Sequence, residues 1–110
     1  MSALCKACRY SLSGLKIVLT ERAFRQELLL GAIMLIVELF RSTTTSMKLY
    51  LFSAYFLVLI MECINSAIET TIDRIGLENH PLSKQAKDIG SAAVFLAILH
   101  LSVVWLLGYL

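Results

Sequence analysis

Five polar residues follow one face of a predicted helix that otherwise consists mostly of apolar residues. At 100° per residue, Glu62, Asn65, Ser66, Glu69 and Asp73 fall within an arc of about 100°. Ionisable groups are costly on a helix that spans a membrane, and by default they indicate a functional site. We therefore interpret this face as the centre of the protein's chemistry rather than as a surface that only satisfies neighbouring helices.

The acidic residues of this face lie at different depths along the helix. Glu62 precedes Glu69 by two turns, which places it about 10 Å further along the axis. Two carboxylates so far apart on one helix cannot easily hold a single metal ion. We expect them to have different tasks, one toward aqueous reagents and one toward the lipid headgroups. Glu21, at the start of an earlier apolar segment, can reach the same layer.

Basic and small residues follow the only proline and add a second set of candidate groups. A helix that begins at Pro81 carries Lys84, Lys87, Asp88 and Ser91 on one face. Carboxylates and lysines at one membrane face suit phosphoryl transfer, which needs a metal ion, cations and a base for the acceptor hydroxyl. The sequence has no G-x-x-x-x-G-K-[ST] loop and no protein-kinase signature, so any nucleotide binding must be unconventional.

The elements that must position these residues follow from composition. The chain has 110 residues and is 58% hydrophobic, above the 45–50% expected of a soluble domain. So small a chain has too little interior to bury that surplus, and the surplus also excludes disorder. A net charge of +2 does not indicate a nucleic-acid partner. The composition predicts a single-domain, all-α integral membrane protein.

Three apolar stretches are long enough to cross a bilayer, at about residues 23–41, 48–70 and 88–110. Residues 1–20 carry adjacent polar and apolar stripes, which predicts an amphipathic helix in the headgroup layer. With three spans, eight of the ten Lys and Arg residues lie on the side of the N-terminus, which is therefore predicted to be cytoplasmic. The C-x-x-C formed by Cys5 and Cys8 lacks a second pair of ligands, and we assign it no metal or redox role.

Three separate segments resemble the prokaryotic diacylglycerol kinases, a family of small membrane enzymes. They are residues 62–73, with their Glu-x-Ile-Asn-Ser-Ala-Ile-Glu pattern, residues 21–27 and residues 80–93, and the resemblance extends from Tyr10 onward. It implies a helical-bundle homotrimer in the bacterial inner membrane, with active sites shared between subunits at the cytoplasmic face. It also implies transfer of the γ-phosphate of MgATP to diacylglycerol, which yields phosphatidic acid.

The same resemblance implies roles for individual residues. By motif position, Glu62 matches the catalytic base and Asn65 a residue close to the chemistry, while Glu21 and Glu69 match the carboxylates that bind Mg²⁺. The nucleotide-binding positions, beyond Glu21 and Glu69, are Tyr10, Glu78, Asn79, His80, Lys87 and Asp88. The lipid-substrate positions, beyond Glu62, are Ala23, Phe24, Arg25, Gln26, Glu27 and Ser91.

Two alternatives to this function stay open at this point. Gram-positive members of the family phosphorylate undecaprenol, which also presents a primary hydroxyl, although the Gly-Ser-Ala-Ala stretch after Asp88 resembles the diacylglycerol branch. A small proton-coupled transporter would instead place its carboxylate near the bilayer midplane in a four-span bundle. The sequence leaves open the acyl-chain preference, the subunit that supplies each half of a site, and the N-terminal basic residue, Lys6 or Arg9, that contacts substrate.

Overall fold

The computed structural model describes residues 2–109, which form four helices and no strand. They are α1 (Ala3–Val18), α2 (Arg22–Phe40), α3 (Thr45–Ile75) and α4 (Pro81–Leu107). The all-α prediction is confirmed for these residues. The helices overlap the predicted amphipathic segment and the three predicted spans, although Leu19, Thr20, Arg41, Gly108 and Tyr109 lie outside the helices. Residues 1 and 110, where those predictions begin and end, lie outside the described part of the chain.

Local sequence explains where three of the helices begin. The Ser2 hydroxyl accepts a hydrogen bond from the Cys5 amide at 3.2 Å, and Thr44 accepts one from the Met47 amide at 3.2 Å. At α4, Nδ1 of His80 accepts from the Leu82 amide at 3.1 Å, and Pro81 follows in the first turn. These side chains satisfy amide groups that have no partner within the helix. Helix α2 differs, because its N-cap residue Glu21 makes no such bond.

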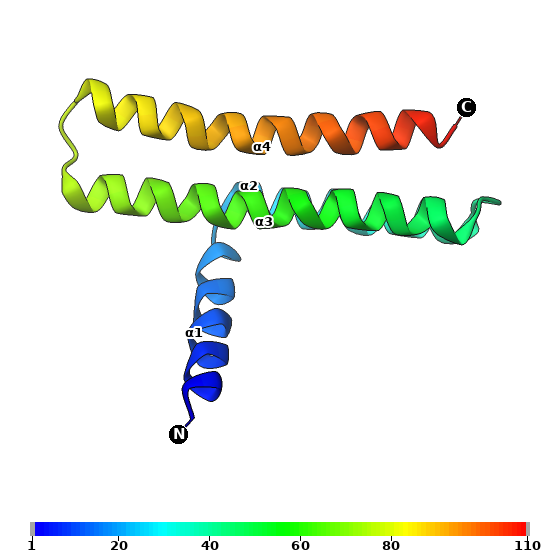
Figure 1. Ribbon diagram of the computed structural model, residues 1–110, viewed down its shortest axis with the longest axis horizontal. Coiled ribbons are helices and arrows are strands. Elements are labelled where there is room, and N and C mark those ends of the chain that lie inside the picture. The colour runs from blue at the N-terminus through cyan, green and yellow to red at the C-terminus, as the bar shows by residue number, and fades with distance from the viewer. Residues whose placement is uncertain (1, 110) are drawn as a thin grey trace.

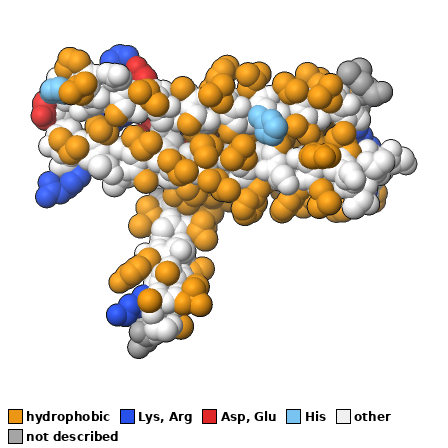
Figure 2. Space-filling model, viewed as in Figure 1, with side chains coloured by type: hydrophobic (Ala, Val, Ile, Leu, Met, Phe, Trp, Pro, Cys, Tyr) orange, Lys and Arg blue, Asp and Glu red, His pale blue; other side chains and the backbone are white. Residues whose placement is uncertain are grey.

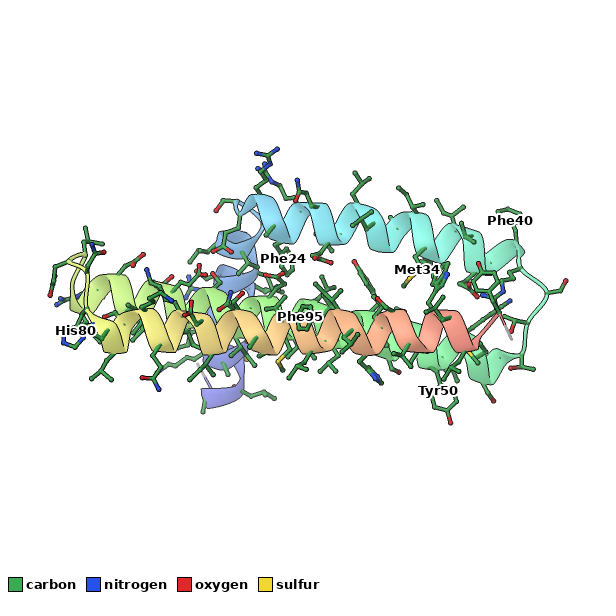
Figure 3. The ribbon with its side chains drawn as sticks, turned by 90° about the horizontal axis from the view of Figure 1, so that it is seen from above. Phe24, Met34, Phe40, Tyr50, His80 and Phe95 are labelled. Atoms are coloured by element: carbon green, nitrogen blue, oxygen red, sulfur yellow. The ribbon has the colours of Figure 1, made fainter. Side chains whose placement is uncertain are left out.

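The helices form a thin bundle with one projecting arm (Figure 1). Helices α3 and α4 run antiparallel and side by side, while α2 packs mainly on α3. Helix α1 projects away from the bundle and joins it partway along α3. Phe24 points from α2 toward α3 and α4, whereas His80 and Phe40 lie at opposite ends of the bundle (Figure 3). The small core includes Phe24, Leu51 and Val58.

Most of the apolar surface faces outward. Helices α3 and α4 are long and apolar enough to cross a membrane, and only 22% and 17% of their most apolar stretches are buried. An apolar helix that is mostly exposed is not the core helix of a soluble protein. Hydrophobic side chains cover the length of the bundle, while many charged ones gather at the α3–α4 turn (Figure 2). Helix α2 is not apolar enough to be counted with them, because the charged residues Arg25, Glu27 and Glu38 interrupt it. That α2 also spans the membrane therefore stays a prediction.

An ion pair and a carbonyl contact hold the opposite end of the bundle together. Arg41 donates to the Glu38 carboxylate at 2.7 Å, and its side chain also donates to the Gly108 carbonyl. The guanidinium group lies 3.8 Å from the centroid of the Tyr109 ring. Arg41 therefore connects the α2–α3 turn to the end of α4, and we call these four residues the Arg41 clasp.

Candidate active site

The candidate site begins at a charged cavity between the ends of α3 and α4. This cavity, of about 630 Å³, lies at the turn that joins the two helices, and we call it the tip cavity. Its volume is in the range of small-molecule sites. Twelve residues line it, and they include five of the predicted nucleotide positions: Glu78, Asn79, His80, Lys87 and Asp88.

Two lysines and two carboxylates form ion pairs across the tip cavity. Lys87 of α4 donates to Asp73 of α3 at 2.8 Å, and Lys84 donates to Asp88 one turn along α4 at 2.6 Å. All four side chains are substantially exposed, so each pair contributes little to stability. Because exposed pairs are weak, an incoming phosphate can compete with the carboxylates for both cations.

Four carboxylates gather deeper in the bundle, where the start of α2 meets α3. Glu21, Glu27 and Glu69 are close enough to Glu62 for their charges to act on it. Glu21 is the N-cap residue of α2 and Glu27 lies within α2, while Glu62 and Glu69 lie on α3. We call this group the acidic cluster. The structure thus brings together the predicted base, both predicted metal ligands and one predicted lipid-side residue.

Hydrogen bonds hold two members of the acidic cluster. Nδ2 of Asn65 donates to Glu69 Oε1 at 3.3 Å, and the Ser66 hydroxyl donates to Glu21 Oε1. Oδ1 of Asn65 is buried, with no partner among the described residues. A Cβ atom at Gly90 of α4 would collide with this oxygen. The glycine therefore provides the space in which the Asn65 amide lies between the two helices.

The donor chemistry of the cluster fits a magnesium ion that arrives with a nucleotide. Within residues 2–109, no three acidic, histidine or cysteine side chains are grouped to hold a metal ion by themselves. Mg²⁺ is usually bound through one or two carboxylates, several waters and phosphate oxygens, so Glu21 and Glu69 are a sufficient protein contribution. Both carboxylates accept hydrogen bonds, as ligating carboxylates commonly do.

Some predicted residues lie apart from both groups. Tyr10 is 72% exposed on the projecting helix α1 and does not line the tip cavity. Phe24 is buried in the core, where it is only 5% exposed. The other lipid-side positions are exposed on the first turns of α2 or on α4: Ala23, Arg25, Gln26 and Ser91. Within one chain, then, the lipid-side residues form an open surface rather than a pocket.

Three further residues contribute to the tip cavity or contact the acidic cluster, although the family resemblance implied no role for them. Ser66 holds Glu21, Lys84 lines the tip cavity, and Asp73 pairs with Lys87. All three lie on the polar faces that helical periodicity had identified. Periodicity therefore contained the signal, but it could not show which residue of another helix each side chain contacts.

The fold and the site together define a class of protein. The chain is an all-helical membrane protein with an open, charged cavity and an acidic cluster near one end of its apolar surface. This arrangement suits an enzyme that joins a water-soluble reagent to a membrane-embedded one.

Comparisons with known proteins identify the family within that class. The family profile described as prokaryotic diacylglycerol kinase matches residues 9–109. A diacylglycerol kinase of Haemophilus influenzae is 42% identical over 106 residues, which cover 96% of this chain and 90% of the relative. One from Pseudomonas aeruginosa is also 42% identical, over 96% of this chain and 86% of the relative, and one from Helicobacter pylori is 36% identical, over 93% and 80%. The chain belongs to the prokaryotic diacylglycerol kinase family and is a lipid kinase.

Proposed function

We propose that this protein catalyses ATP-dependent phosphorylation of diacylglycerol to phosphatidic acid at the cytoplasmic face of the bacterial inner membrane. The observation that carries the proposal is the order of the tip cavity and the acidic cluster along the axis of the bundle. The tip cavity lies at the end of the bundle, at the α3–α4 turn, and the acidic cluster lies further along the bundle, where α1 joins α2. A soluble phosphate donor and a lipid hydroxyl can therefore approach one another along the same pair of helices.

The lengths of the helices indicate where the membrane boundary lies along the bundle. Ser66 contacts Glu21, so the start of α2 is level with Ser66 on α3. From Thr45 to Ser66, α3 rises about 32 Å, close to the thickness of a hydrocarbon core, and the 19 residues of α2 rise about 28 Å. The remaining residues of α3 extend about 14 Å further, so the tip cavity lies in water.

In this proposal each half of the site has its own task. Lys84 and Lys87 neutralise phosphate charge in the tip cavity, while Glu21 and Glu69 would hold the magnesium ion of the nucleotide. A magnesium ion held there would offset the negative charge that develops on the phosphate during transfer. Glu62 lies about 10 Å below Glu69 on α3 and one turn inside the membrane boundary at Ser66, where the hydroxyl of a membrane-embedded lipid can reach it.

In the proposed phosphoryl transfer, one bond to phosphorus forms as another breaks. Glu62 takes the proton of the diacylglycerol hydroxyl, and the hydroxyl oxygen forms a bond to the γ-phosphorus. The bond between that phosphorus and the β–γ bridging oxygen breaks, and ADP leaves. Catalysis of this kind depends on positioning and electrostatic stabilisation, which a rigid pair of helices can supply. By family resemblance, the functional unit is a homotrimer in which neighbouring subunits complete the lipid side of each site.

A lipid phosphorylation assay tests the proposal directly. Purified protein in mixed micelles should transfer radiolabelled phosphate from ATP to dioleoylglycerol, and much more slowly to undecaprenol. Faster phosphorylation of undecaprenol would assign the protein to the other branch of the family. Phosphorylation of neither lipid by folded protein would refute the kinase proposal.

A further inference from the structure

Ser66 differs from three other helical hydroxyl groups in the acceptor of its hydrogen bond. Ser11, Thr71 and Ser102 each donate to the backbone carbonyl four residues earlier in their own helix, at 2.7–3.0 Å. This local bond is the ordinary choice for a hydroxyl within a helix. Ser66, which is only 8% exposed, donates instead to the Glu21 carboxylate, 45 positions away in the sequence.

The Glu21 side chain reaches away from its own helix. Glu21 is the N-cap residue of α2, but its side chain makes no hydrogen bond to an amide of the first turn. Its backbone stays part of the turn that precedes α2, because its amide donates to the Val18 carbonyl at 3.0 Å. Among the described residues, the side-chain hydrogen bond of Glu21 therefore joins the start of α2 to α3.

We infer that Ser66 is a positioning residue, which fixes the Glu21 carboxylate beside α3 so that it can bind the metal ion of the nucleotide. This inference rests on the proposed function, in which Glu21 and Glu69 are the metal-binding carboxylates. Ser66 engages Oε1 only, and Oε2 has no hydrogen-bond partner among the described residues. Asn65 holds Glu69 through one oxygen in the same way. Adjacent residues of α3 thus orient two carboxylates from two different helices.

The expected effect follows from the behaviour of groups that support metal ligands. Without the hydroxyl, the Glu21 side chain can turn back toward the amides of its own helix. Loss of such a supporting partner typically weakens metal affinity by about 10- to 100-fold. Ser66→Ala should therefore weaken metal binding while leaving the identity of the ligands unchanged, and Ser66→Thr, which keeps the hydroxyl, should restore it.

The test measures metal binding without turnover. Free Mn²⁺ is counted by electron paramagnetic resonance as it is titrated into the full-length protein with a non-hydrolysable ATP analogue. We expect the dissociation constant for Mn²⁺ to rise about tenfold in Ser66→Ala and to stay near the wild-type value in Ser66→Thr. Ser102→Ala, which removes a hydroxyl that bonds only within its own helix, is the matched control and should bind Mn²⁺ as the wild type does.

Glu21→Gln, measured in parallel, separates two kinds of failure. If Glu21→Gln weakens Mn²⁺ binding and Ser66→Ala does not, the positioning inference is wrong and the proposed function stands. If neither variant changes the binding seen in the wild type, Glu21 is not a metal ligand and both proposals about it fall. A Ser66→Ala protein with a lower melting temperature but an unchanged dissociation constant would show that Ser66 has only a structural role.

Discussion

At the scale of single residues, hydrogen bonding distinguishes Glu62 from the two proposed metal ligands, Glu21 and Glu69. Two members of the acidic cluster accept side-chain hydrogen bonds, Glu21 from Ser66 and Glu69 from Asn65. No side-chain hydrogen bond to Glu62 is present among residues 2–109, although the charges of three other glutamates act on it. A carboxylate without such a donor keeps its oxygens available for the proton of a substrate, which is what a general base requires.

If Glu62 is the base, as proposed, replacing it should reduce turnover and spare nucleotide binding. Glu62→Gln keeps the size of the side chain but cannot accept the hydroxyl proton, and we expect the turnover number to fall by about 10²–10⁴-fold. The dissociation constant for the ATP analogue, measured by calorimetry, should stay close to that of the wild type. Glu38→Gln removes a buried carboxylate at the other end of the bundle and should leave turnover per folded molecule unchanged. Lost nucleotide binding with normal turnover at saturation would make Glu62 a nucleotide ligand instead.

At the scale of elements, the contact between α2 and α3 depends on one small residue. Gly31 of α2 is buried, and a Cβ atom there would overlap the side chain of Tyr55 on α3. The Tyr55 hydroxyl donates to the Glu27 carbonyl at 3.0 Å, which brings this ring close to the backbone of α2. The contact lies one turn beyond the acidic cluster and so helps to set the spacing between the helices that form it.

Enlarging Gly31 should separate these helices. Gly31→Ala is expected to destabilise the protein by about 1–3 kcal/mol, because overpacking forces neighbouring atoms apart. Thermal unfolding in detergent measures the change, and adding Tyr55→Ala should make the effect of Gly31→Ala much smaller, as a double-mutant cycle would show. Gly14 on α1 is the matched control, since nothing lies within 4 Å of a Cβ atom there. If Gly31→Ala and Gly14→Ala have the same effect, close packing at Gly31 is not what holds α2 to α3.

The Arg41 clasp gives a second prediction at this scale. Removing one partner of a buried ion pair leaves an uncompensated charge, whereas replacing both partners with apolar residues is often neutral. The side chains of Arg41 and Glu38 are only 16% and 6% exposed. Arg41→Met should therefore lower the stability by about 3–5 kcal/mol, and Arg41→Met combined with Glu38→Leu should recover most of it. Equal melting temperatures for the single and double variants would show that the unpaired Glu38 carboxylate is not the cause.

At the scale of the whole molecule, the sequence predicted what periodicity and composition determine. The helices, their approximate limits and the polar faces follow from spacing, because a helix repeats every 3.6 residues. The pairing of Ser66 with Glu21, of Arg41 with Gly108 and the contact at Gly31 could not be predicted in this way. These contacts depend on how the helices pack, and packing geometry is not encoded in the spacing along any one helix. The motif comparison predicted roles for the residues of the acidic cluster, but not the hydrogen bonds that Glu21 and Glu69 accept.

The orientation of the whole chain decides whether the tip cavity can meet ATP at all. Eight of the ten Lys and Arg residues lie on the side of the N-terminus and the α3–α4 turn, and basic residues are retained in the cytoplasm. Arg41, one of the two on the other side, is paired with Glu38 in the clasp, which further lowers the net positive charge there. The distribution of basic residues therefore predicts that the tip cavity lies in the cytoplasm, as the proposed function requires.

Labelling of single cysteines can establish this orientation. Ser42 and Asn79 are exposed residues of the α2–α3 and α3–α4 connections, which lie at opposite ends of the bundle (Figure 1). In a background with Cys5, Cys8 and Cys63 replaced by serine, a membrane-impermeant maleimide applied to intact spheroplasts should label Ser42→Cys and not Asn79→Cys. Lysing the spheroplasts should expose Asn79→Cys, which controls for its reactivity. Labelling of Asn79→Cys in intact spheroplasts would place the tip cavity on the outer side of the membrane, where no ATP is supplied. The tip cavity could then not be the ATP site of a kinase.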